Sequence, residues 1–289
     1  ERRRADPRAE TNAYMGARAA EDALRDAGLA SAEVDLILNA SGTQQQPIPD
    51  GAALVQAELG LGETGVTAFS VHGTCLSFVA ALDVAATYVA SGRYARVLIV
   101  TSEIGSVGLN PREPESATLI GDGAAAVIVG RAGDSEGSRV EALRFETYAH
   151  GAAHTEIRGG GTFLPPGHPA SSAEDFTFHM DGPKVLRLAR AYAPGFLERL
   201  RPGLSSSLAG VDVVVPHQAS LVGLRLLSRF GWPDEAVVST LAELGNCVAA
   251  SIPLTLHHAV RTGRLRRGQR VLLVGTGAGF SIGGAVLTY

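Results

Sequence analysis

A short apolar segment passes directly into an alanine-rich helical pattern in the stretch Ala68-Phe-Ser-Val-His-Gly-Thr-Cys-Leu-Ser-Phe-Val79. This order predicts a strand that leads into a helix, with Cys75 at the junction. The start of a helix has unpaired N–H groups and the positive end of the backbone dipole, which favour a thiolate over a thiol. Cys75 is therefore a candidate nucleophile, although a lone cysteine in such a helix is more often a small buried core residue.

Short apolar runs alternate with helical patterns along the whole chain, which predicts an α/β fold. Three segments recur in the same order, and this recurrence indicates two copies of one unit with both sheets buried between helices. The matching pairs are residues 34–41 with 211–220, 73–75 with 245–247, and 96–101 with 270–275. We predict helices at 11–26 and 51–59 and strands at 34–39, 97–101, 124–129, 211–215, 271–274 and 284–288.

Two further segments have the chemistry to serve a reactive sulfur, Val215-Pro-His217-Gln-Ala and Leu244-Gly-Asn246-Cys-Val. Cys75 and Asn246 fall at nearly matching helix starts of the two halves, and His217 follows a strand. Such positions are where α/β folds gather reactive groups. A cysteine nucleophile needs proton transfer and oxyanion stabilisation, which His217 and Asn246 could supply. Each residue taken singly is more often structural, so the hypothesis depends on the three occurring together.

The remaining candidates are weaker. The loop Gly275-Thr-Gly-Ala-Gly279 could bring backbone N–H groups close to the site, but no Lys-Ser/Thr pair follows it, so it is not a phosphate loop. Asp122 is expected to be structural and Cys247 to be a core residue. The other histidines considered are expected on loops, on a helix or in an uncertain direction beside the thiol: His72, His150, His154, His168, His257 and His258.

Composition excludes several classes of protein. The 289 residues are 45% hydrophobic with a net charge of −4, which gives no sign of nucleic-acid binding. No apolar stretch is long enough to cross a bilayer and no signal-peptide pattern opens the chain. Two cysteines form neither a disulfide framework nor a metal-ligand spacing, so we expect no metal and a reducing cytoplasm. Because the chain starts at Glu1 without Met, we expect a further N-terminal segment.

Several motifs closely resemble the β-ketoacyl-acyl-carrier-protein synthase III family of thiolase-fold condensing enzymes. They follow the family's order and run from about Met15 to the C-terminus. These motifs are Thr74-Cys75-Leu-Ser-Phe78, Gly121-Asp-Gly-Ala-Ala125, Met180-Asp-Gly182, Val215-Pro-His-Gln-Ala219, Gly245-Asn-Cys-Val-Ala-Ala-Ser-Ile-Pro253 and Gly277-Ala-Gly-Phe280. The resemblance implies a thiolase fold, with duplicated halves that form a five-layered α-β-α-β-α architecture, and a homodimer.

The resemblance also implies the reaction. Cys75 would take an acyl group from a thioester of coenzyme A or acyl carrier protein, with no permanently bound cofactor. A malonyl thioester would then lose CO2, and its enolate, stabilised by His217 and Asn246, would attack the acyl group. The backbone N–H groups of Cys75 and Ala278 would form the oxyanion hole. Acyl carrier protein is the expected partner.

The same resemblance places candidate substrate-binding residues. Ile48 falls where the family closes the acyl pocket across the dimer interface, and Ile120 falls on the wall of that pocket; both are equally compatible with plain core. Ser220 and Thr276 stand where the family has an Asn and a Phe, and Val222 stands where it has an Arg that contacts the carrier or cofactor. Because these donor-recognition positions differ, we expect a specialised member of secondary metabolism.

We expect two halves, residues 1–170 with the nucleophile and residues 171–289 with His217 and Asn246. Two alternative functions stay open. The enzyme could move the acyl group from Cys75 to an oxygen or nitrogen acceptor without forming a carbon–carbon bond. The chain could also be a catalytically silent subunit that shapes a partner's tunnel, although such a subunit has no need for the three residues in register.

Overall fold

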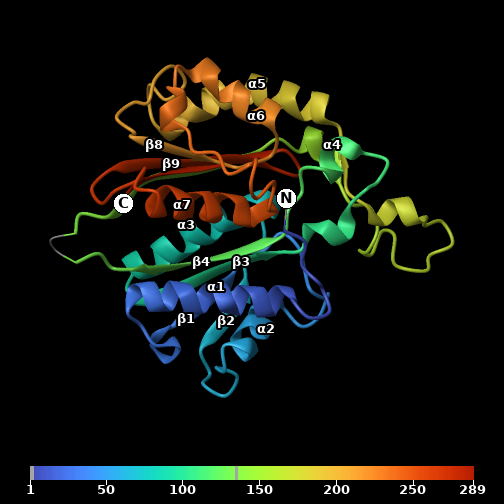
Figure 1. The fold of residues 1–289 in the computed structure, drawn as a ribbon, viewed down its shortest axis with the longest axis horizontal. Coiled ribbons are helices and arrows are strands. Elements are labelled where there is room, and N and C mark those ends of the chain that lie inside the picture. The colour runs from blue at the N-terminus through green and yellow to red at the C-terminus, as the bar shows by residue number, and fades with distance from the viewer. Residues whose placement is uncertain (1–2, 134–135) are drawn as a thin grey trace.

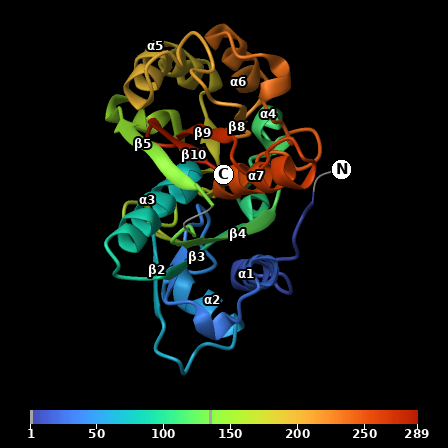
Figure 2. The ribbon, with the colours of Figure 1, turned by 90° about the vertical axis from the view of Figure 1, so that its left-hand side faces the viewer.

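A computed structural model describes residues 3–133 and 136–289 of the chain. Helices and sheets alternate in five layers, with α3 (Ser77–Ala90) and α7 (Ser251–Arg261) as the central layer between two sheets (Figure 1). Turning the molecule by 90° keeps these two helices in the middle and the remaining long helices outside (Figure 2). This arrangement is the five-layered α/β architecture that the sequence predicts.

The first sheet has the strand order β2-β1-β3-β4. Its strands are β1 (Leu36–Asn39), β2 (Thr67–Ser70), β3 (Arg96–Glu103) and β4 (Gly123–Gly130). Strand β1 runs parallel to both of its neighbours, and β4 runs antiparallel to β3. The strands predicted here are confirmed, and β3 and β4 extend beyond the predicted bounds because they pair along their whole length.

The second sheet has the order β5-β10-β9-β8. Its strands are β5 (Arg139–Thr147), β8 (Val213–Pro216), β9 (Arg270–Gly277) and β10 (Ser281–Thr288). A separate pair joins β6 (Thr155–Glu156) to β7 (His179–Met180). Because β5 already pairs with β10, the chain passes from one sheet to the other between β4 and β5. That crossover does not coincide with the expected division at residue 170.

The internal duplication is visible in the pairing of the strands. In the first sheet β1 pairs parallel with β3, in the register Leu36 opposite Val97. In the second sheet β8 pairs parallel with β9, in the register Val213 opposite Val271. Even the turn contacts repeat, since Asp35 and Asp212 each accept a hydrogen bond from the backbone N–H of the arginine that opens the paired strand. The match of 96–101 with 270–275 is therefore correct to the residue.

The Cys75 segment matches the second half two residues further along than the sequence comparison suggests. A 3-10 turn, Thr74–Leu76, precedes α3, and the turn Val248–Ala250 precedes α7. Each turn opens with a β-branched residue at positive φ, 51° at Thr74 and 47° at Val248. Cys75 is thus equivalent to Ala249, and Asn246 lies ahead of the matching turn.

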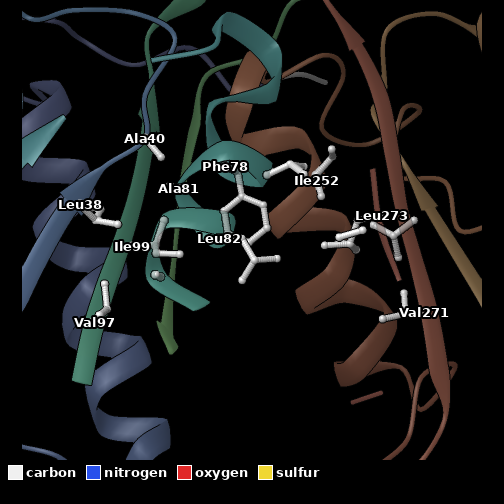
Figure 3. Close-up of a cluster of buried hydrophobic side chains, with 14 of the residues drawn as sticks. Leu38, Ala40, Phe78, Ala81, Leu82, Val97, Ile99, Ile252, Val271 and Leu273 are labelled. Atoms are coloured by element: carbon white, nitrogen blue, oxygen red, sulfur yellow. The ribbon is translucent and has the colours of Figure 1, made fainter. Parts of the chain in front are cut away.

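The core lies between the two sheets. Phe78 and Leu82 of α3 pack with Ile252 of α7, between Ile99 of the first sheet and Leu273 of the second (Figure 3). These side chains are buried almost completely. Burying a large apolar side chain contributes roughly 1.5–3 kcal/mol, so this layer holds the two halves in a fixed relation.

The outer helices cover the far face of each sheet. Those beside the first sheet are α1 (Asn12–Ala27) and α2 (Gly51–Glu58), and those beside the second are α5 (Gly182–Leu200) and α6 (Leu221–Leu226) (Figure 1). Helix α1 begins after the N-cap Thr11 and ends at Gly28 in the left-handed conformation, as predicted. A single-turn helix, α4, spans Pro114–Ala117. Across residues 3–133 and 136–289, no helix is long and apolar enough to cross a bilayer.

Candidate active site

The thiol of Cys75 lies in a 3-10 turn, one turn ahead of α3. The side chain of Ser77 fixes this turn, because its Oγ accepts from the N–H of Gly73 at 2.9 Å and donates to the carbonyl of Thr74 at 2.7 Å. The residue is only half-buried, whereas the other cysteine, Cys247, is buried as predicted. The turn thus places the residue at the edge of the core, partly exposed, with its thiol group buried.

Two backbone N–H groups point at that sulfur, those of Ala278 and of Cys75 itself. Ala278 follows β9, and the preceding Gly277 makes the close approach possible. A β-carbon on Gly277 would lie 2.8 Å from Oγ1 of Thr74 and 3.3 Å from the carbonyl oxygen of Gly73. A side chain there would push β9 away from the turn, so glycine is required at this position.

Burial raises the pKa of the Cys75 thiol to about 12, and the charge of Glu103 adds to this effect. The two backbone N–H groups lower the pKa, but by less. The expectation that the helix start alone favours the thiolate is therefore wrong. The sulfur lies between two sheets, where losing hydration costs more than the backbone dipoles return.

His217 follows β8 directly, and its N–H donates to the carbonyl of Val274 at 2.8 Å. Its side chain is 7% exposed, and burial lowers the pKa of the imidazole to about 4. The ring is therefore neutral near pH 7. Among the described residues its Nδ1 makes no hydrogen bond although it is buried. A neutral imidazole of this kind can accept a proton or donate a hydrogen bond.

Asn246 lies in a turn that β-bridges to Ile120. Its carboxamide oxygen accepts from the N–H of Val248 at 3.0 Å and from the hydroxyl of Ser251 at 3.5 Å. Because both partners donate, the oxygen is fixed in this direction and the NH2 group faces the other way. Within residues 3–133 and 136–289, no hydrogen bond is recorded for that NH2 group. The side chain can therefore offer an N–H to a ligand.

The segments that carry these residues are held together by close contacts. Gly275 lies between the β-carbon of His217 and Leu76, the residue after Cys75: an added β-carbon would be 2.6 Å from the former and 3.3 Å from the Cδ2 of the latter. On the other side, a β-carbon at Gly42 would be 2.8 Å from the side chain of Val248 and 3.3 Å from the carbonyl of Thr74. The structure thus brings the segments of all three predicted residues to the Cys75 turn.

The sequence analysis missed Glu103, the last residue of β3. It is fully buried, and its carboxylate accepts hydrogen bonds from the backbone N–H groups of Gly42, Thr43 and Ala249. An acidic residue at the end of an apolar strand usually marks the exit to solvent, so its pattern was misleading. Asp122, by contrast, accepts from the backbone and hydroxyl of Ser106, which fits its predicted structural role.

A cavity of about 640 Å³ opens between α5 and α6 and reaches His217. Predicted substrate-binding residues Ser220 and Thr276 line it. Most of its lining is apolar and includes Val185, Leu186, Ala189, Phe196, Leu224 and Leu227.

The other two predicted pocket residues lie elsewhere. Ile120 is 5% exposed and packs beside the Asn246 turn, and Ile48 is 84% exposed on a loop ahead of α2. The sequence did not predict the cavity because its walls come from segments far apart in the chain. The described residues contain no group of three or more His, Cys, Asp or Glu side chains placed to hold a metal ion.

Comparison with known proteins places this site in a family. Residues 69–149 match the family model described as 3-oxoacyl-[acyl-carrier-protein (ACP)] synthase III, and residues 205–289 match the model of its C-terminal part. A β-ketoacyl-[acyl-carrier-protein] synthase III of Streptomyces coelicolor is 37% identical over 94% of this chain and 81% of its own length. The chain belongs to the 3-oxoacyl-[acyl-carrier-protein] synthase III family. The resemblance drawn from the motifs is confirmed.

Solved structures agree with this assignment. The crystal structure of 3-oxoacyl-[acyl-carrier-protein] synthase III from Aquifex aeolicus has a TM-score of 0.86 with 31% identity, over 100% of this chain and 87% of that one. Xanthomonas campestris OleA has a TM-score of 0.85 with 22% identity, over 100% and 83%. At that identity the second similarity concerns the fold alone. The predicted thiolase fold is confirmed, and membership of this family makes the protein a transferase in the broad sense.

Proposed function

We propose that the protein is a β-ketoacyl synthase that condenses an acyl group held on Cys75 with a malonyl thioester. The observation that carries this proposal is the pair of backbone N–H groups, from Cys75 and Ala278, that point at one thiol. Donors in this position stabilise the oxyanion that forms when a thiolate attacks a thioester. Names of the relatives, which specify a β-ketoacyl product and acyl carrier protein, support the same reaction.

In the first half-reaction the Cys75 sulfur attacks the carbonyl carbon of an acyl thioester. As this carbon–sulfur bond forms, the thiol proton passes to the neutral imidazole of His217, which gives it up again readily because its pKa, about 4, disfavours the imidazolium. The carbon–sulfur bond to the donor thiol then breaks, and the departing thiolate takes the proton. The products are the acyl thioester of Cys75 and a free thiol of coenzyme A or acyl carrier protein.

In the second half-reaction the malonyl thioester loses CO2, and the electron pair of the broken bond forms an enolate. Neutral N–H donors stabilise the enolate oxygen, from the imidazole of His217 and the carboxamide of Asn246. The enolate carbon forms a bond to the acyl carbon, and the Cys75 sulfur leaves as a thiolate that is reprotonated. The orientation of the Asn246 carboxamide, with its oxygen already hydrogen-bonded, supports this role.

The cavity between α5 and α6 is the route by which we expect thioesters to enter. His217, Ser220 and Thr276 are among the residues that line it. Its apolar walls suit the chain of a coenzyme A or carrier-protein thioester. Leu221 and Val222 are exposed at the start of α6, where an arginine is expected in the family, so carrier recognition here would depend less on charge. No permanently bound cofactor is needed for either half-reaction.

We also expect a homodimer. Ile48 is the most exposed large apolar side chain among the described residues, and a second copy would remove it from water. In that dimer Ile48 would close the acyl pocket of the partner, with Ile120 on the wall of the pocket. Light scattering on the wild type and on Ile48→Arg tests this: the wild type should have twice the mass of the chain and the variant should dissociate. A monomeric wild type would contradict the dimer.

Two measurements test the function. Intact-protein mass spectrometry after incubation with acyl thioesters should give one acyl adduct on the wild type and none on Cys75→Ala. Release of CO2 from a malonyl thioester should then require the acylated enzyme. If the adduct forms without CO2 release, the acyltransferase alternative holds instead. If purified protein forms no adduct, the silent-subunit alternative is favoured.

A further inference from the structure

Glu103 is a buried acid that neither half-reaction uses. Its side chain has 0% exposure, at the end of β3. The N–H of Gly42 donates to Oε1 at 2.5 Å and the N–H of Thr43 donates to Oε2 at 2.8 Å. The N–H of Ala249 donates to the same carboxylate. Such a complete set of backbone donors indicates a built site for a negative charge.

These donors come from segments that meet the predicted catalytic residues. Gly42 is wedged between Val248, two residues after Asn246, and the carbonyl of Thr74, the residue before Cys75. Ala249 is the structural counterpart of Cys75 in the second half. One carboxylate therefore ties the Asn246 turn to the loop that packs on the Cys75 turn.

The duplication indicates that the fold itself does not require an acid here. Because Arg96 of β3 and Arg270 of β9 are equivalent, Glu103 is equivalent to Gly277. Each of these two strand ends contacts the turn of the opposite half: Gly277 packs on Thr74, and Glu103 accepts from Ala249. The second half makes this contact with a glycine, so the carboxylate in the first half serves something more than packing.

The carboxylate also acts on the sulfur through its charge. Glu103 raises the pKa of Cys75, since a nearby negative charge disfavours a thiolate. Burial raises the pKa of Glu103 itself to about 7, against the lowering effect of its backbone donors. The charge of Glu103 therefore changes near pH 7.

We propose that Glu103 is a positioning residue that holds the Asn246 turn against the Cys75 turn and whose negative charge, added to burial, lowers the reactivity of the free sulfur. The proposal rests on Cys75 being the nucleophile of the proposed condensation. Burial and this charge together explain why a cysteine beside a helix start stays a thiol in the free enzyme. The unliganded enzyme is thereby protected from alkylation and oxidation, which act on thiolates.

Few other titratable groups face the Cys75 turn. His217 lies on the far side of Gly275 from Leu76 of this turn, and its imidazole is neutral near pH 7. His72 comes two residues before the turn and is exposed, and its Nδ1 lies 3.3 Å from the carbonyl oxygen of Ser41. Strand β9 has its charged Arg270 at the far end and α3 has Asp83 on its exposed side. Among these groups, Glu103 is the buried one whose charge raises the pKa of Cys75.

The test is the rate at which iodoacetamide alkylates Cys75 at pH 8, located by peptide mass spectrometry. Glu103→Gln removes the charge, so the pKa of Cys75 should fall and the alkylation rate should rise about tenfold. Glu103→Asp keeps the charge but shortens the side chain, so its alkylation rate should stay near that of the wild type while condensation falls. Glu58→Gln, which removes an exposed carboxylate, is the control and should change neither rate.

A loosened structure would not by itself give this pattern, provided that circular dichroism shows each variant to be folded. An alkylation rate for Glu103→Gln equal to or below the wild-type rate would overturn the proposal.

The wild type gives a second test that needs no variant. Its log rate should rise by less than one unit per pH unit between pH 6 and 8, because Glu103 gains its charge there and opposes ionisation of Cys75. A slope of one throughout this range would also overturn the proposal. Since alkylation needs no thioester, a failure of the proposed condensation would leave these readouts intact and be recognised separately.

Discussion

His217 and Leu76 lie on opposite sides of one glycine, Gly275 of β9. A β-carbon at that glycine would be 2.6 Å from the β-carbon of His217 and 3.3 Å from Leu76. Leu76 follows Cys75 in the same turn, so the distance between the imidazole and the thiol depends on a residue without a side chain. The position of the thiol in the first half therefore depends on how Gly275 of the second half packs against Leu76.

Gly275→Ala should therefore reduce condensation by about 10²-fold, since small displacements of reacting groups are costly. Alkylation of Cys75 by iodoacetamide should persist, because the sulfur itself is not removed. Turnover with acyl and malonyl thioesters measures the loss. Gly62→Ala is the matched control, because a β-carbon there meets nothing within 4 Å. Equal losses in the two variants would contradict this account.

Burial of a neutral His217 makes stability depend on pH. Its pKa falls from 6.5 to about 4 on folding, so the unfolded chain binds the proton more readily and stability rises with pH between 4 and 6.5. The full difference corresponds to about 3 kcal/mol. Thermal unfolding of His217→Asn should have a smaller rise over this range than the wild type. Glu103 titrates with the opposite sign but is present in both proteins. Parallel curves would show that burial of His217 does not set this dependence.

Asn246→Ala should separate the two half-reactions. The amide N–H serves the enolate and not the acylation step, so the acyl adduct on Cys75 should form at the wild-type rate. Release of CO2 should fall by about 10²–10³-fold, the usual effect of losing one such donor. Ser251→Ala, which removes only a 3.5 Å hydrogen bond to the same side chain, should have a much smaller effect. An equal loss of acylation and decarboxylation in Asn246→Ala would assign this residue to the fold instead.

Much of this architecture could be predicted from the sequence, because apolar runs and helix caps are local signals. The N-cap Thr11 and the terminal Gly28 of α1 are residue types that mark helix ends, so both could be predicted. The equivalence of Arg96 and Arg270 follows from the similar sequences of the strands that they open. The match of Cys75 with Cys247 was misplaced by two residues, because the comparison aligned identical residue types. The equivalent positions in the structure are instead Thr74 and Val248, which both have positive φ. Neither residue type predicts such a backbone conformation.

The parts that sequence reasoning missed depend on contacts between distant segments. In the sequence, Glu103 has the pattern of a residue at a strand end that faces solvent. Only the structure shows that the backbone N–H groups of Gly42 and Ala249 donate to its buried carboxylate. Helix α5 contains Pro194, which interrupts the pattern by which helices are recognised, and the chain continues as a helix through it. The cavity between α5 and α6 was missed partly for the same reason, since one of its walls belongs to that helix.

The cavity between α5 and α6 gives the last prediction. Ala189 is a small residue on its wall, and Ala189→Trp would fill part of the space with a large side chain. If thioesters reach Cys75 through this cavity, acylation should slow by about tenfold or more, because the variant displaces the bound chain. Alkylation by iodoacetamide, a much smaller reagent, should be unchanged. Arg190→Trp adds the same side chain at the next position of α5, which is exposed and does not line the cavity, and it should acylate normally. Normal acylation of Ala189→Trp would mean that the substrate enters by another route.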